Sequence, residues 1–257
     1  MDAAESCSSS SPSPRPSPTS WSSLGAALSL LPGFSAAYVS VRVRLILALA
    51  LTLVVQPVVA PTLPGLPASP AALALLVAGE VTIGTFIAVL VRIVVAALQV
   101  AGTFIAYFSS LANALVQDPV ADQQTSTISG FLGTLGLVLI FVTDLHHLML
   151  RALVTSYDRF PPGMALPTDG FAEAATAAVA ASMAIGLQLA APFLVVALVY
   201  TVGLGLLGRL MPQLPVFFFG MPIQISFQIW AMALTISGIM LVFLNQFRET
   251  LSPFAGP

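Results

Sequence analysis

Residues Ala71–Gln117 read AALALLVAGEVTIGTFIAVLVRIVVAALQVAGTFIAYFSSLANALVQ, and only two of them, Glu80 and Arg92, are charged. A helix needs about 20 mostly apolar residues to cross a hydrocarbon layer of roughly 30 Å. At 1.5 Å per residue, one helix over this stretch would be about 70 Å long. We therefore expect the stretch either to break into two helices near Arg92 or to project out of a bilayer.

The rest of the chain has the composition of a membrane protein. Of its 257 residues, 58% are hydrophobic and 7% are charged, and the mean hydropathy is +0.99. Soluble domains carry about 25% charged residues, so these charges are too few to cover a soluble enzyme. A net charge of −2 offers no basic patch for nucleic acid. The single cysteine, Cys7, excludes a disulfide framework and a cysteine-built metal site.

Apolar segments on both sides of Ala71–Gln117 predict an all-α, polytopic membrane protein with six to seven long hydrophobic helical segments. Ser126 or Thr127 is placed to cap the helix that begins at Ile128, and Pro192 is expected to kink the segment that contains it. Three parts of the chain are expected: a disordered Ser/Pro-rich tail over 1–20, a helical membrane domain over 21–250 and a short tail over 251–257. The other segments are Trp21–Val41, Leu45–Ala60, Ile128–Tyr157, Phe171–Leu207 and Val216–Leu244.

Uncharged polar residues form a stripe in the second half of the central stretch. Because they are three or four residues apart, they lie on one face of a helix. Such a face points away from lipid, toward a helix of the same chain, a subunit interface or the wall of a conduit. The spacing does not choose among the three. The polar residues of the stripe are Gln99, Thr103, Ser110, Asn113 and Gln117, and the small Ala106 lies on the same face.

Ionisable residues at membrane depth offer an alternative function. A secondary transporter would use Glu80, Arg92 and Asp144 as coupling groups, whereas a subunit of a complex would pair them with its partners. His146 and His147 beside Asp144 suggest a metal or proton relay. Adjacent helical residues diverge by about 100°, however, and no third ligand is evident. We expect no metal site, no cofactor, no nucleophile–base pair and therefore no enzyme.

Several motifs, in the same order along the chain, resemble the FliR family of flagellar export proteins and, more distantly, its type III secretion homologues. The strongest is GLGLLGRLMPQLPVFFFGMPIQI, Gly203–Ile225. The residues that carry this match are Arg209, Pro212, Gln213, Leu214, Gly220 and Pro222. The other matches are VRVRLILALALTLVVQP from Val41, GEVTIG from Gly79 with Asp118-Pro119 beyond it, DLHHLMLRAL from Asp144 with FPPG after it, and GLQLAAP from Gly186.

The resemblance implies a subunit of the flagellar type III export apparatus in the bacterial inner membrane, within the flagellar basal body. It implies helical hairpins in an oligomeric export gate, built with FliP- and FliQ-like subunits and next to an FlhB-like subunit. Membrane lipid and passing flagellar proteins would be the other partners. The family's pore-side loop corresponds to about Asn113–Thr127 here. The candidate gate residues on it are Asn113, Gln117, Asp118, Pro119 and Asp122.

Overall fold

The computed structural model describes residues 18–35, 39–59, 69–109, 115–118, 123–161, 168–211 and 216–255. These residues form seven helices and one antiparallel pair of short strands, which confirms the predicted all-α membrane fold. The elements in chain order are α1 (Pro18–Leu30), α2 (Val41–Val59), α3 (Pro70–Phe108), β1 (Leu115–Asp118), β2 (Gln123–Ser126), α4 (Thr127–Val142), α5 (Leu145–Arg159), α6 (Thr168–Leu210) and α7 (Val216–Ala255).

The two predicted tails are shorter than expected where they can be compared with the structure. Helix α1 already begins at Pro18, inside the tail predicted over 1–20, and α7 continues to Ala255, inside the tail predicted over 251–257. The predicted disorder of residues 1–17 lies outside the described residues.

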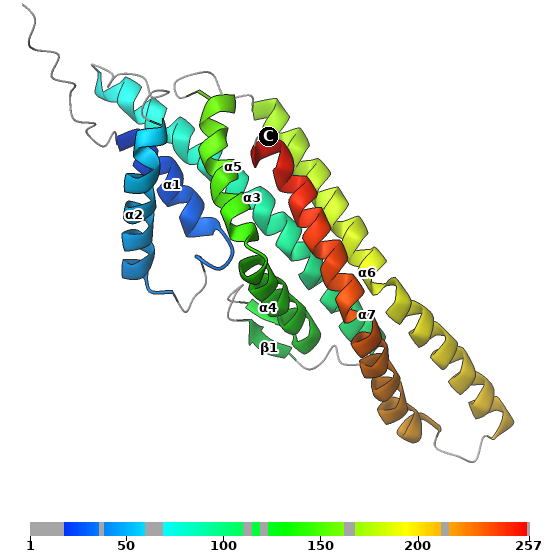
Figure 1. Cartoon of the computed structure of the whole chain (residues 1–257). Helices are drawn as coiled ribbons and strands as arrows, with labels where there is room; N and C mark the ends of the chain where they lie inside the picture. Colours follow the sequence, from blue (N-terminus) through cyan, green and yellow to red (C-terminus); the bar gives the residue numbers. More distant parts are fainter. Residues whose placement is uncertain are drawn as a thin grey trace, which may run out of the picture.

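Helix α3 is the central element of the molecule, and α1, α4 and α6 pack along it (Figure 1). Its start is set by Ser69, whose hydroxyl accepts a hydrogen bond from the Ala72 amide, and by Pro70 in the first turn. The helix then runs without a break for 39 residues, about 58 Å. The expected break near Arg92 is therefore wrong, and the alternative of one long helix holds.

The segment expected to be one helix over Ile128–Tyr157 is instead two helices, α4 and α5, which meet at 74°. Ser126 caps α4 as predicted, accepting a hydrogen bond from the Ser129 amide. The break lies at Thr143 and Asp144, where the Thr143 hydroxyl donates to the Leu139 carbonyl at 2.7 Å. Asp144 follows in the left-handed conformation, with φ 58°, which turns the chain out of the α4 axis.

Four of the described helices are long and apolar enough to cross a membrane: α2, α3, and most of α6 and of α7. The bent α4–α5 pair makes a fifth if it counts as one span. The expectation of six or seven crossings is therefore too high for the described residues. Helix α1 has only 13 residues, and α4 and α5 are each too short to span about 30 Å alone.

Helices α6 and α7 form a long hairpin whose tip extends beyond the other elements (Figure 1). Helix α6 continues through Pro192 as one helix of 43 residues. At the opposite end of the hairpin, four aromatic rings from α3, the end of α5, α6 and α7 pack together, with Phe86 stacked on Phe171 at 4.3 Å between centroids. The other two rings are those of Phe160 and Phe254.

Candidate functional site

The expected gate segment, Asn113–Thr127, follows α3 in the chain, and part of it forms the β1–β2 pair. Strand β1 contains Gln117 and Asp118, which pair with Gln124 and Gln123 of β2. The last residue of β2, Ser126, is also the N-cap of α4. The pair is thus attached directly to the helix that packs on α3. The other three candidate gate residues, Asn113, Pro119 and Asp122, lie outside the described residues.

The polar stripe of α3 serves in part to pack α4. Gln99 is half-buried, and its main-chain carbonyl accepts a hydrogen bond from the Ser129 hydroxyl of α4 at 3.0 Å. Gly102 lies against the Ser129 backbone, so that the two helices approach closely here. Thr103 is exposed, and its hydroxyl donates to the Gln99 carbonyl at 2.8 Å. Ser110 lies outside the described residues.

Two glutamines of α7 join three helices at the C-terminal end of α3. The Gln224 amide donates to the Phe108 carbonyl at 2.9 Å. The Gln228 amide donates to the Phe193 carbonyl of α6 at 3.2 Å and, more weakly, to Phe108 at 3.4 Å. Gln228 is only 2% exposed, and its side-chain oxygen is buried without a partner among the described residues.

The sequence-based predictions did not include this glutamine pair, although the spacing of the two residues indicates it. Two glutamines four residues apart on an otherwise apolar helix predict a polar contact on one face. Since both amides donate to the Phe108 carbonyl, they hold the last residue of α3 against α7. The expected gate segment follows this point in the chain.

The family-motif residues lie at and near the tip of the α6–α7 hairpin. Arg209 is exposed in the last turn of α6, and Pro222 is exposed inside α7. Gly220 is buried against Leu204, and its carbonyl accepts a hydrogen bond from the Tyr200 hydroxyl. The other motif residues, Pro212, Gln213 and Leu214, lie outside the described residues.

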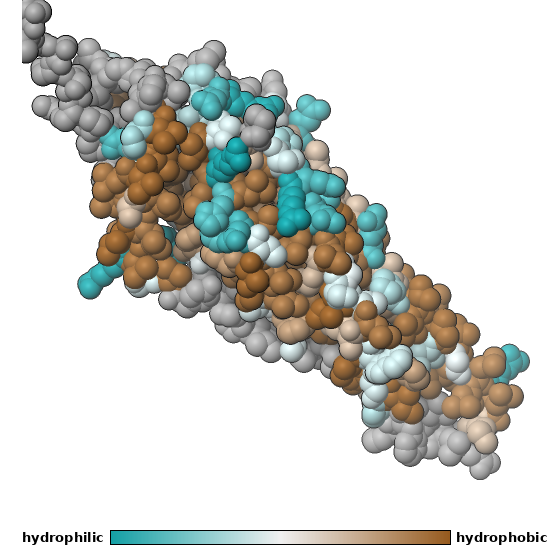
Figure 2. Space-filling model, in the orientation of Figure 1, coloured by the Kyte–Doolittle hydropathy of each residue, from teal (hydrophilic) through white to brown (hydrophobic). Residues whose placement is uncertain are grey.

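Apolar side chains cover the outer faces of this hairpin. The chain itself buries 61% of the most apolar window of α3 but only 22% of that of α6 and 28% of that of α7. Figure 2 shows hydrophobic surface along the coloured part of the hairpin toward its tip, with paler polar patches between. On α7 a shallow apolar pocket of about 510 Å³ is lined by Pro222, Ile223, Ser226, Phe227 and Trp230. A Cβ atom at Gly136 would meet the Leu98 side chain, whereas one at Gly205 on α6 would meet nothing within 4 Å.

The three residues of the transporter alternative do not share an environment. Glu80 is 2% exposed on α3, with Tyr157 of α5 as a polar neighbour. Arg92 is exposed on the same helix. Asp144 lies at the α4–α5 break, with its side chain 77% exposed. A coupling site would need these groups to converge.

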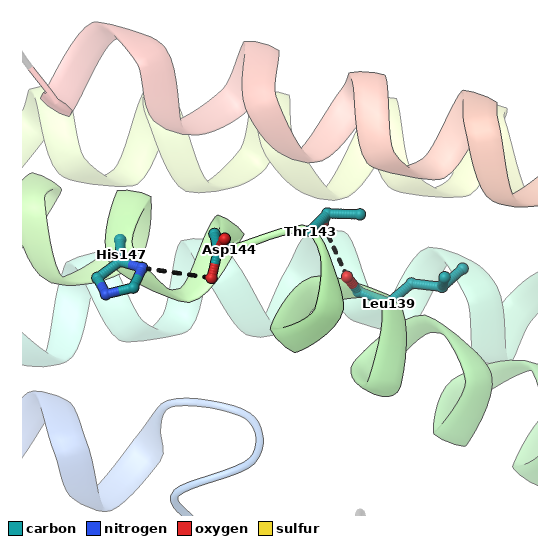
Figure 3. Close-up of polar contacts among 4 residues, drawn as sticks. All are labelled: Leu139, Thr143, Asp144 and His147. Carbon is teal, nitrogen blue, oxygen red and sulfur yellow. Dashed lines mark hydrogen bonds and ion pairs between the residues drawn. The ribbon is translucent and has the colours of Figure 1, made fainter.

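The two histidines lie closer to Asp144 than the sequence predicted. The His146 and His147 rings are 4.1 Å apart between centroids. The His147 Nδ1 atom lies 3.8 Å from the Asp144 carboxylate (Figure 3). Both histidines belong to the first turn of α5, just after the break, where the rings lean toward one another despite their divergence around the axis. The prediction that they point apart is therefore wrong.

These features define a class: a helical, multi-pass membrane protein whose longest hairpin is apolar and uncovered. The profile of the family "Bacterial export proteins, family 1" matches residues 24–250. The flagellar biosynthetic protein FliR of Caulobacter vibrioides is 36% identical over 231 residues, which cover 90% of this chain and 92% of that protein. This chain therefore belongs to the bacterial export proteins of family 1, the group of the FliR relatives.

More distant relatives agree with this assignment. FliR of Escherichia coli is 29% identical over 211 residues, covering 81% of this chain and 79% of that protein. FliR of Bacillus subtilis is 29% identical over 175 residues, covering 67% and 68%. The resemblance seen in the sequence motifs is thus confirmed. The chain is a membrane subunit of the flagellar type III export apparatus.

Proposed function

We propose that this subunit is a structural part of the export pore, held in the bacterial inner membrane by lipid and by neighbouring export subunits. The observation that carries the proposal is the length of uncovered apolar surface on α6. Exposed large apolar side chains run from Val179 to Leu210, a distance of about 47 Å along the helix. A hydrocarbon layer of roughly 30 Å would cover that length only at a tilt of about 50°. Helices in membranes tilt by about 0–40°.

Neighbouring protein subunits cover the part of the apolar α6 surface that the bilayer does not reach. We assign this role to FliP- and FliQ-like subunits, with an FlhB-like subunit nearby, because the family resemblance implies them. The chain then performs no chemistry of its own, and flagellar proteins pass it in transit. Its membrane domain spans about 21–250.

Cysteine cross-linking in the assembled complex tests this cover. In a Cys7→Ser background, Val199→Cys places a thiol on the exposed face of α6, where Val199 is 67% exposed. We expect it to cross-link to a FliP- or FliQ-like subunit. Ala197→Cys is the matched control, because Ala197 is 8% exposed and faces the chain's own interior. Lipid-only accessibility at Val199, with no subunit cross-link, would contradict the proposal.

We further propose that the segment from Asn113 to Thr127 is the gate. What supports this role is its position: it leaves α3 beside the glutamine contacts of α7 and returns through β2 into α4. Asn113, Gln117, Asp118, Pro119 and Asp122 are the proposed pore-facing residues.

Shortening the chain between Val116 and Ser126 tests the gate. The assembled complex should then leak ions or small metabolites across the inner membrane. A deletion of equal length within residues 61–68 is the control and should leave the membrane tight. Unchanged permeability after the first deletion would mean that this segment only connects α3 to α4.

A further inference from the structure

Three potential ligands converge at the break between α4 and α5. Asp144, His146 and His147 each offer one donor atom, and the three atoms all lie within 4.8 Å of one another. The two imidazole rings lie 4.1 Å apart between centroids. These are the only two histidines of the chain.

Small side-chain rotations would bring these donors to binding distance. Zinc binds imidazole nitrogen at about 2.0–2.1 Å, so neighbouring donors of a tetrahedral site lie about 3.4 Å apart. No pair here must therefore close by more than about 1.4 Å. The Asp144 and His147 side chains are 77% and 71% exposed. Both can turn without disturbing packed neighbours.

The donor atoms are not committed to other partners. Asp144 is the N-cap of α5, yet its side chain makes no capping hydrogen bond. Its distance of 3.8 Å from the His147 Nδ1 atom is too long for a hydrogen bond. The His146 Nδ1 atom is buried without a partner among the described residues. The Phe141 ring, stacked on His146 at 5.2 Å, holds that imidazole in place.

We propose that Asp144, His146 and His147 bind a divalent transition-metal ion of the zinc, cobalt or nickel class. Two imidazoles and one carboxylate suit such ions, whereas Mg²⁺ and Ca²⁺ prefer oxygen donors throughout. Three protein ligands leave a fourth position for water or for a ligand from a neighbouring subunit. The ion joins Asp144, the left-handed residue at the break, to the first turn of α5.

Cobalt titration of the full-length chain tests the site. The protein is purified in detergent on an affinity tag that contains no histidine, because a histidine tag would itself bind cobalt. His146 and His147 are then the only histidines present. We expect one Co²⁺ per chain, with the visible absorption of a four-coordinate ion, displaced by Zn²⁺. His147→Ala and Asp144→Ala should each weaken binding at least about tenfold, since even loss of a ligand's hydrogen-bonding partner costs 10–100-fold.

Asp158→Ala is the matched control, because Asp158 is an exposed acid on the same helix outside the cluster. It should leave cobalt binding unchanged. His147→Gln replaces His147→Ala if the alanine variant does not fold, and Zn²⁺ should raise the unfolding temperature of the original chain but not of this variant. Absence of Co²⁺ binding at 100 μM, or equal losses in the Asp158 and His147 variants, would overturn the proposal. Since the readout is metal binding, it is independent of pore function.

Discussion

Replacing Gly102 with alanine should separate α3 from α4. A Cβ atom at Gly102 would lie 2.8 Å from the Ser129 backbone nitrogen, 3.1 Å from the Ser129 Cβ atom and closer still to the Ser129 Cα atom. Carbon atoms pack at about 3.5–4.0 Å. The neighbour is backbone, which cannot rotate away, so the two helices must move apart by about 1 Å.

The cost follows from what the contact contains. Forcing an extra methyl group into a packed interface typically costs about 1–3 kcal/mol. The shift also lengthens the hydrogen bond from the Ser129 hydroxyl to the Gln99 carbonyl, now 3.0 Å, which adds about 1 kcal/mol. Alanine returns about 0.5–1 kcal/mol through its better helix propensity. We expect the free energy of unfolding to fall by about 2 kcal/mol.

Gly238→Ala is the matched control, because a Cβ atom at this position of α7 meets nothing within 4 Å. This control should be stabilised by about 0.5–1 kcal/mol, so that the two variants differ by about 3 kcal/mol. Reversible unfolding of the purified chain in mixed micelles measures both. A Ser129→Gly change should not rescue Gly102→Ala, since the clash involves main-chain atoms. Equal stability of the two alanine variants would refute the reasoning.

Three further predictions concern single side chains. Gln228→Glu should lower the free energy of unfolding by several kcal/mol by burying a charge beside carbonyl groups, whereas Gln228→Leu should change it by about 1 kcal/mol or less, because the leucine also removes the unpaired amide oxygen. Arg159→Ala should lower the free energy of unfolding by about 1 kcal/mol, because the guanidinium lies over the Phe254 ring at 5.8 Å. The loss should be smaller in a Phe254→Ala background, and a double-mutant unfolding cycle measures this coupling. Glu80→Gln should keep motility in soft agar, since glutamine has the same shape and avoids burying a charge; loss of motility together with loss of solute uptake in liposomes would favour the transporter alternative.

The helical class and most helix ends could be predicted because they depend on local chemistry. Ser126 caps a helix through its own hydroxyl, and the polar or proline-rich sequence between apolar segments marks where helices stop. The continuity of α3 through Arg92 could not be predicted in this way. It depends on α1, α4 and α6, which pack along the helix and bury residues of it from Glu80 to Ala106.

The break at Thr143 and Asp144 also escaped prediction, because the sequence there contains no proline or glycine. Its cause is a left-handed aspartate and a threonine hydroxyl bonded back to Leu139. Neither the conformation of Asp144 nor the hydrogen bond of Thr143 follows from the composition of this segment. The two histidines lie in α5 just after that break, and their rings lie 4.1 Å apart between centroids although adjacent helical residues diverge around the axis.

The polar stripe shows why the candidate site was only partly predictable. Helical spacing places Gln99 and Thr103 on one face, but packing decides what that face meets. The structure brings Ser129 to the Gln99 carbonyl and leaves Thr103 exposed. A periodic pattern therefore identifies a face, whereas its partner depends on Gly102, which has no side chain and so adds nothing to a polar pattern.

The burial of the helices divides the subunit into a part that the chain itself covers and a part that other molecules must cover. Helix α3 is covered by the chain's own α1, α4 and α6, so this part can hold its shape before assembly. The tip of α6 and α7 has no such cover, although the Gln224 and Gln228 contacts attach it to the end of α3. A neighbour that covers the tip therefore acts on the same hairpin that holds the C-terminal end of α3. If the segment after α3 is the proposed gate, we expect assembly to act on it through Phe108.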